Sequence, residues 1–170
     1  LHEKHIMRLR ASETNMTNTI PFRSKSQLTN QKNLANYIHL AQNISPVWKN
    51  LPGFSWSANI WNTPRGLLRF MKYGIKLHAR ALPMPAQQFD SGYMEFAKAY
   101  LLNSRRGDPT KAFRVDYLAV QIVGAALVEV DGYADITRLS PLHLEKAVDI
   151  IKKRKKGQLN AAVALKALVR

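Results

Sequence analysis

The longest apolar stretch of this chain runs from Val115 to Val130, and it decides what the core can be. A helix that is apolar nearly all round has to be covered on every side by other elements. We therefore predict that this helix runs through the centre of a helical bundle and ends at Asp131-Gly132. Asp116, Gln121 and Glu129 interrupt the stretch, so no window reaches the roughly 18 uncharged residues of a membrane span, and we predict none.

Capping signals predict further helices around the central one. Apolar residues recur at helical spacing from Tyr93 to Leu101. Asp108-Pro109 is a start signal for the central helix, because aspartate caps free N–H groups and proline lacks the N–H that would stay unpaired there. Ser140-Pro141 predicts a third helix by the same logic, which ends in the basic run Lys152 to Lys156. A fourth helix is expected to start near Leu159.

The chain divides into three parts by composition. Residues 1–33 are polar and charged and predict a flexible arm. Residues 34–83 form a small basic, aromatic-rich subdomain, with a short amphipathic helix at Leu34 to Gln42. Its stretch from Val47 to Asn62 holds all three tryptophans, which favours a small core under a loop over a base-stacking platform. Residues 84–170 form a helical domain, so the fold class is mainly α.

The end of the second part allows two structures. Thr63-Pro64 could cap a helix, but apolar and polar residues alternate from Met71 to Ala81. A period of two is typical of a strand. We favour a short strand or β-hairpin, whose polar edge would be a basic ribbon.

Acidic residues are missing from a long part of the chain. No Asp or Glu occurs from Thr14 to Phe89, whereas that stretch holds nine cations of a chain with net charge +15. A globular surface normally mixes both signs, and a surface of one sign repels itself until a polyanion binds. Nucleic acid is the partner that this pattern favours. The alternative is a basic surface without functional consequence.

The candidate DNA contacts are cations of the basic ribbon and of the helices and their ends. Basic residues at one helix end are ordinary, because the helix dipole attracts them. Together with the acid-free stretch they indicate phosphate binding. The candidates are Arg69, Lys72, Lys76, Arg80, Lys98, Arg105, Arg106, Lys111, Arg114, Lys152, Lys153 and Arg154.

The residues of common catalytic sites are missing from the sequence. There is no cysteine, which excludes disulfides and thiolate metal sites and fits the cytoplasm best. His2-Glu3-Lys4-His5 lacks a spacer residue of a zinc-protease helix, and no phosphate-binding glycine loop or nucleophile elbow occurs. We predict no catalytic residue, no metal and no cofactor.

Several short motifs carry a resemblance to a known family. They are Phe96-Ala97-Lys98-Ala99-Tyr100, Pro109-Thr110, Ala125 to Val130, Gly132, Ala134-Asp135 and Thr137-Arg138-Leu139. From about Pro83 to Lys155 the chain resembles the core-binding region of large tyrosine recombinases, the phage-integrase-type enzymes of mobile elements. The resemblance implies a SAM-like four-helix domain that forms half of a clamp around recombination-site DNA.

In that family catalysis belongs to a separate C-terminal domain with arginines, a lysine, an HxxR motif and a tyrosine nucleophile. His5 to Arg8 fits HxxR by spacing alone and lies in the arm. The chain opens on Leu1 and stops within an apolar helical pattern, so we expect a piece of a longer protein. The prediction is a fragment that binds double-stranded DNA, in the nucleoid, for a recombinase that self-associates on DNA.

Two other classes of function stay open. A stand-alone interaction protein would dock on a partner through its terminal helix, Leu159 to Val169. An RNA-binding module would stack unpaired bases on its aromatic rings. Those rings would be Trp48, Phe54, Trp56 and Trp61.

Overall fold

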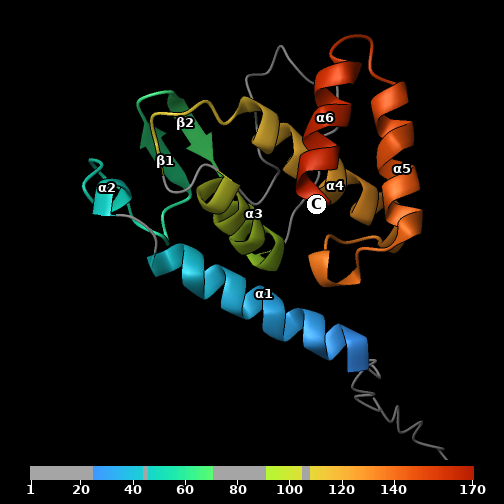
Figure 1. Cartoon of the computed structure of the whole chain (residues 1–170), viewed down its shortest axis with the longest axis horizontal. Helices are drawn as coiled ribbons and strands as arrows, with labels where there is room; N and C mark the ends of the chain where they lie inside the picture. The colour runs from blue at the N-terminus through green and yellow to red at the C-terminus, as the bar shows by residue number, and fades with distance from the viewer. Residues whose placement is uncertain (1–24, 44–45, 71–90, 105–107) are drawn as a thin grey trace, which may run out of the picture.

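The computed structural model describes residues 25–43, 46–70, 91–104 and 108–170 (Figure 1). In this part the chain is mainly helical, with one antiparallel β-hairpin. No helix in the described residues is long and apolar enough to cross a bilayer. The elements are α1 (Lys25–Asn43), α2 (Pro46–Lys49), β1 (Ile60–Thr63), β2 (Gly66–Arg69), α3 (Ser91–Ser104), α4 (Arg114–Asp131), the 3-10 turn η1 (Ile136–Arg138), α5 (Pro141–Lys152) and α6 (Gln158–Leu168).

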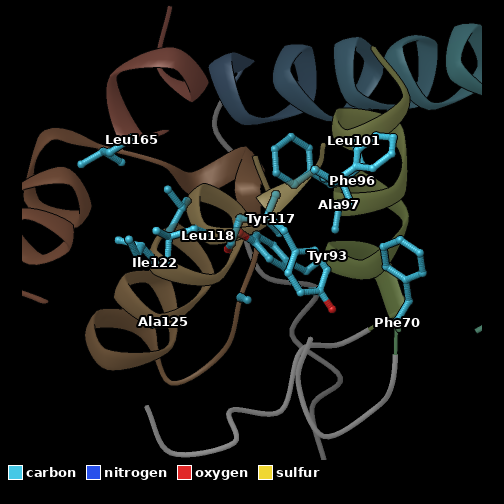
Figure 2. Close-up of a cluster of buried hydrophobic side chains, with 14 of the residues drawn as sticks. Phe70, Tyr93, Phe96, Ala97, Leu101, Tyr117, Leu118, Ile122, Ala125 and Leu165 are labelled. Carbon is cyan, nitrogen blue, oxygen red and sulfur yellow. The ribbon is translucent and has the colours of Figure 1, made fainter. Parts of the chain in front are cut away.

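Helix α4 is the centre of the fold, as its apolar sequence predicts. Every residue from Asp116 to Leu127 is buried, and α3, α5 and α6 all pack against this helix. Figure 2 shows α4 side chains such as Leu118 and Ile122 among residues of α3 and α6. The helix ends where predicted, because Gly132 takes the left-handed conformation (φ 82°) that glycine adopts without strain.

The start of α4 differs from the prediction. The helix begins at Arg114, not at Asp108-Pro109. Asp108 accepts hydrogen bonds from the backbone N–H and the hydroxyl of Thr110, at 2.9 and 2.6 Å, and so closes a turn. Aspartate favours such local turns as readily as helix caps, which explains why the same signal has two outcomes.

Helix α1 is longer than its sequence predicts. It begins at Lys25, so residues 25–33 are helical although the composition indicates a flexible arm. The predicted amphipathic segment provides the packing, since Leu34, Tyr37, Ile38 and Ala41 lie at helical spacing on the core. Once this packed segment is helical, each residue added at its N-terminal end gains a backbone hydrogen bond without the cost of starting a new helix. This explains why α1 extends back to Lys25.

The three tryptophans form a small core, as predicted, and a β-hairpin is part of it. Trp48 and Trp61 have no exposed surface. Trp61 lies with its ring centre 5.5 Å from Trp48, 5.0 Å from Phe54 and 4.8 Å from Phe70. These separations are typical of tilted and edge-to-face aromatic pairs, which add to the burial energy.

The hairpin pairs Thr63 with Gly66 next to its turn. Gly66 has a positive φ of 123°, which suits glycine. Thr63-Pro64 therefore begins a hairpin turn and not a helix. The alternating run from Met71 to Ala81, where we favoured a strand, lies outside the described residues, as does the boundary at residue 83.

The later helices follow their start signals. Ser140 precedes α5, and its backbone N–H donates to Nδ1 of His143 at 3.2 Å. Helix α6 begins at Gln158, one residue before the predicted start. In α3 the hydroxyl of Tyr93 donates to the carbonyl of Val120 at 2.6 Å, and burial raises the pKa of Tyr93 well above its ordinary value.

Candidate nucleic-acid interface

A hydrogen bond joins the hairpin turn to the segment that leads into α4, and these two segments carry three exposed cations. Arg65, in the turn, donates through Nε to the carbonyl of Thr110 at 2.7 Å. Thr110 lies beside Lys111 in sequence, and Arg114 begins α4. We call Arg65, Lys111 and Arg114 the basic corner; all three are exposed.

One carboxylate lies at this corner. Asp108 is 3.9 Å from the ammonium of Lys111. The hydrogen bonds from the hydroxyl and the N–H of Thr110 lower the pKa of Asp108, so it stays ionised at neutral pH. The three exposed cations outnumber this carboxylate. Exposed ion pairs at such distances are weak, so Lys111 remains available to another anion.

A second basic surface is the turn between α5 and α6. Five cations follow one another from Lys152 to Lys156, and all but Arg154 are exposed. The side-chain amide of Gln158 donates to the carbonyls of Lys152 and Arg154, at 2.9 and 3.0 Å, and so holds the turn in shape.

Arg154 differs from its neighbours because it is half-buried. Its Nε and Nη1 atoms are buried without a hydrogen-bond partner. Burial lowers the pKa of its guanidinium below the ordinary value, and the group nevertheless stays charged at neutral pH. Figure 1 shows this turn at the top of the view, between α5 and α6.

Lys98 is one of the candidate contacts, but the structure buries it. Only 3% of this residue is exposed. Its ammonium donates to the carbonyl of Trp56 at 2.8 Å, lies 3.4 Å from a carboxylate oxygen of Glu95 and sits 5.6 Å from the ring centre of Phe70. Lys98 therefore joins α3 to the aromatic cluster, and we remove it from the interface.

Changing Lys98 to methionine should distinguish a role in stability from a role in DNA binding. The variant keeps the volume of the side chain but leaves the Trp56 carbonyl without its donor, which should cost roughly 1–3 kcal/mol of unfolding free energy. Urea unfolding measures that loss. DNA affinity, measured under conditions where both proteins are folded, should stay within about twofold. A salt slope shallower by one would instead return Lys98 to the interface.

The remaining candidates are partly outside the described residues. Lys111, Arg114, Lys152 and Lys153 are exposed, whereas Arg154 is half-buried. Arg69 ends β2, and its side chain is not described. Lys72, Lys76, Arg80, Arg105 and Arg106 lie outside the described residues.

Arg65 was missing from the candidates although it lies at the basic corner. Its position depends on the hairpin turn and on the contact with Thr110, 45 residues away. A turn signal was present in the sequence, because Pro64-Arg65-Gly66 combines two turn-forming residues.

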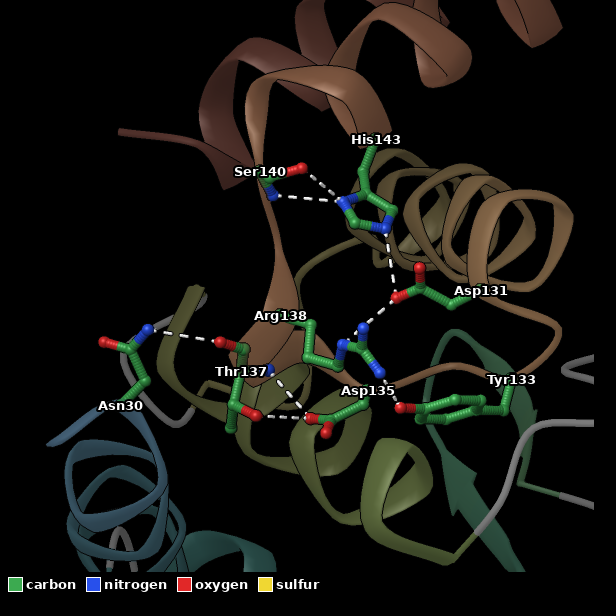
Figure 3. A network of polar contacts seen from close by, with 8 residues as sticks. All are labelled: Asn30, Asp131, Tyr133, Asp135, Thr137, Arg138, Ser140 and His143. Carbon is green, nitrogen blue, oxygen red and sulfur yellow. Dashed lines mark hydrogen bonds and ion pairs between the residues drawn. The ribbon is translucent and has the colours of Figure 1, made fainter. Parts of the chain in front are cut away.

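A polar network includes residues between Gly132 and Leu139, where several motifs of the family resemblance lie (Figure 3). Arg138 lies with Nε 3.4 Å from a carboxylate oxygen of Asp131 and also donates to the hydroxyl of Tyr133. The same Asp131 oxygen is 3.2 Å from Nε2 of His143. These contacts tie the end of α4 to η1 and to the first turn of α5.

Asp135 and Thr137 extend the network to α1. Asp135 accepts from the N–H and the hydroxyl of Thr137, at 2.9 and 2.6 Å. The carbonyl of Thr137 accepts from the side-chain amide of Asn30 at 3.1 Å. All these groups hold backbone segments together, so the arrangement is that of a structural network.

The aromatic cluster does not supply a stacking surface through its two central rings. Trp48 and Trp61 are 0% exposed, and a ring without exposed surface cannot stack on a base. Phe54 and Trp56 are partly buried against the same cluster. The RNA-binding alternative therefore loses Trp48 and Trp61 as stacking rings and keeps only the partly exposed Phe54 and Trp56.

Within residues 25–43, 46–70, 91–104 and 108–170, no three His, Asp or Glu side chains are grouped to hold a metal ion. Comparisons with protein-family models, with curated proteins and with solved structures find no match for this chain.

Proposed function

We propose that this chain binds duplex DNA as the N-terminal part of a site-specific tyrosine recombinase of a mobile element. The basic corner is the observation that carries the DNA-binding part of the proposal. Two segments far apart in the sequence are joined there and carry three exposed cations, and among the described residues Asp108 is the acid that pairs with one of them. The assignment to recombinases rests on the resemblance of the short motifs between about Pro83 and Lys155.

Phosphate contacts supply the binding energy under this proposal. Arginine and lysine neutralise phosphates and release condensed counterions, which gives affinity without sequence specificity. Helix α6 supports the second basic surface, because its first turn has no side-chain cap and its free N–H groups add partial positive charge beside Lys155 and Lys156.

The chain has no catalytic role of its own in this proposal. It grips recombination-site DNA in the nucleoid, and a separate catalytic domain of the parent protein cuts and rejoins the strands. The parent protein self-associates on DNA. The proposal requires neither metal nor cofactor for binding.

Removing the basic corner tests the proposal. In the Arg65→Ala, Lys111→Ala, Arg114→Ala triple variant, each lost phosphate contact should reduce the slope of log K against log salt by about one. We expect a slope shallower by about three and weaker binding to every duplex sequence. Fluorescence anisotropy with labelled duplexes at several salt concentrations measures both quantities.

The matched control removes three cations from another part of the chain. Lys4→Ala, Arg8→Ala, Arg10→Ala has the same change in net charge and leaves the basic corner intact. Its effect on the slope should be smaller. Equal, small effects of both triple variants, with helix content unchanged by circular dichroism, would refute the basic corner as the DNA contact.

A stand-alone interaction protein remains the second candidate. One observation favours it: α6 exposes 78% of Leu159 and 55% of Val163. Large apolar side chains exposed on one helix are typical of surfaces that bind other proteins.

A further inference from the structure

An apolar groove runs along the outer side of α5 and α6. It encloses about 560 Å³, and its apolar lining includes Val148 and Ile151 from α5 and Leu159, Ala162 and Val169 from α6. Figure 1 shows the two helices side by side, joined by the turn that carries the second basic surface.

The groove has a buried part and an exposed part. The buried residues Ile151 of α5 and Leu165 of α6 belong to its lining, whereas Ala161 and Ala164 are buried on α6 without lining it. Leu159 is 78% exposed and Val169 is 43% exposed. No described residue covers these side chains.

The rim of the groove is positively charged. Lys152 and Lys166 line it together with the apolar residues, and no acid of the described residues is among the lining, although the ammonium of Lys152 lies 3.9 Å from a carboxylate oxygen of Asp149. From residue 150 to 170 the chain has seven cations and no Asp or Glu. They are Lys152, Lys153, Arg154, Lys155, Lys156, Lys166 and Arg170.

This charge pattern selects among the possible occupants. Nucleic-acid phosphates suit the rim but not the apolar floor, because they would lose their hydration there. A second copy would bring its own Lys152 and Lys166 against the same two lysines, which like charges disfavour. An occupant with an apolar face flanked by carboxylates satisfies both the floor and the rim.

We propose that this groove binds an acidic amphipathic α-helix of a protein partner. The lining positions 159, 162, 166 and 169 recur at helical spacing along α6, and α5 supplies a second wall. Two neighbouring helices form a furrow into which the apolar ridge of a third helix packs. The lined part of α6 spans about 15 Å, which matches three turns of a bound helix. The proposal is independent of DNA binding.

Two synthetic peptides test the proposal on the whole chain. Both are stapled helices of about 16 residues with leucine at the same i, i+3, i+4 and i+7 positions. One carries glutamate on its polar face and the other carries lysine. In anisotropy titrations we expect the glutamate peptide to bind about tenfold or more tightly than the lysine peptide. Equal binding, or no binding of the glutamate peptide, overturns the proposal.

Variants locate the binding site. Ala162 is exposed in the groove, so Ala162→Trp fills it without disturbing the core, and Leu159→Ser removes its most exposed large apolar side chain. Each should weaken the affinity for the glutamate peptide by about tenfold, as expected for one lost apolar contact. Val163→Ser is the matched control, because Val163 is exposed on the same helix but does not line the groove. A loss with Val163→Ser equal to that with Leu159→Ser overturns the assignment.

Two further measurements address the other occupants. Concentration-dependent dimerisation that Ala162→Trp abolishes would overturn the proposal in favour of a second copy. Binding to vesicles of phosphatidylserine and phosphatidylcholine that depends on Leu159, without binding of the glutamate peptide, would overturn it in favour of a membrane surface. DNA affinity of Ala162→Trp should equal that of the unaltered chain, so the outcome here is separate from that of the DNA-binding proposal.

Discussion

Trp61→Ala is expected to lower the unfolding free energy by about 3–5 kcal/mol. The side chain is fully buried and lies against four other rings, so its removal leaves a large cavity that its neighbours cannot fill. The indole N–H also donates to the carbonyl of Ser55 at 2.9 Å, and that acceptor would lose its partner. Urea unfolding, followed by far-UV circular dichroism, measures the change.

The loss should affect the helical domain as well as the hairpin. Trp48 lies 5.5 Å from Trp61 and 5.6 Å from Phe113, which directly precedes α4. Ile60→Ala is the matched control, because Ile60 is in the same strand with 44% of its surface exposed. It should cost less than about 1 kcal/mol. Similar losses for both variants would contradict a core centred on Trp61.

DNA affinity should fall about a thousandfold between 50 and 200 mM salt if six phosphates are neutralised. The reason is counterion release, which gives log K against log salt a slope of about −5 for six contacts. The basic corner and the turn between α5 and α6 together contain seven exposed cations, enough for that number. Anisotropy titrations of one labelled duplex across this salt range measure the slope.

The control for this experiment is the fold itself. Circular dichroism recorded at each salt concentration should stay constant, so that the change in affinity reports on binding. Unrelated duplexes should have similar slopes, because phosphate contacts carry no sequence information. An affinity independent of salt would refute the proposed DNA binding.

Local signals predicted much of the helical architecture. The apolar stretch from Val115 to Val130 has to be buried in any fold of this chain. Ser140-Pro141 starts a helix and Gly132 ends one through local backbone conformation and hydrogen bonds. These features depend on residues within one or two helical turns, so they can be predicted from the neighbouring residues in the sequence. Two predictions were wrong where the local sequence is compatible with two structures. Asp108 forms a turn instead of a helix cap, and residues 25–33 extend α1 instead of forming a flexible arm.

The sequence alone determined the excess of positive charge, the absence of acids from residue 14 to 89, the central apolar helix and the aromatic cluster. Only the tertiary structure decided which cations reach the surface. The ammonium of Lys98 is buried, where it donates a hydrogen bond to the carbonyl of Trp56, 42 residues away. Arg65 is held near Lys111 because its Nε donates a hydrogen bond to the carbonyl of Thr110. The physical reason is that burial and charge pairing depend on contacts between distant segments, which no local pattern specifies.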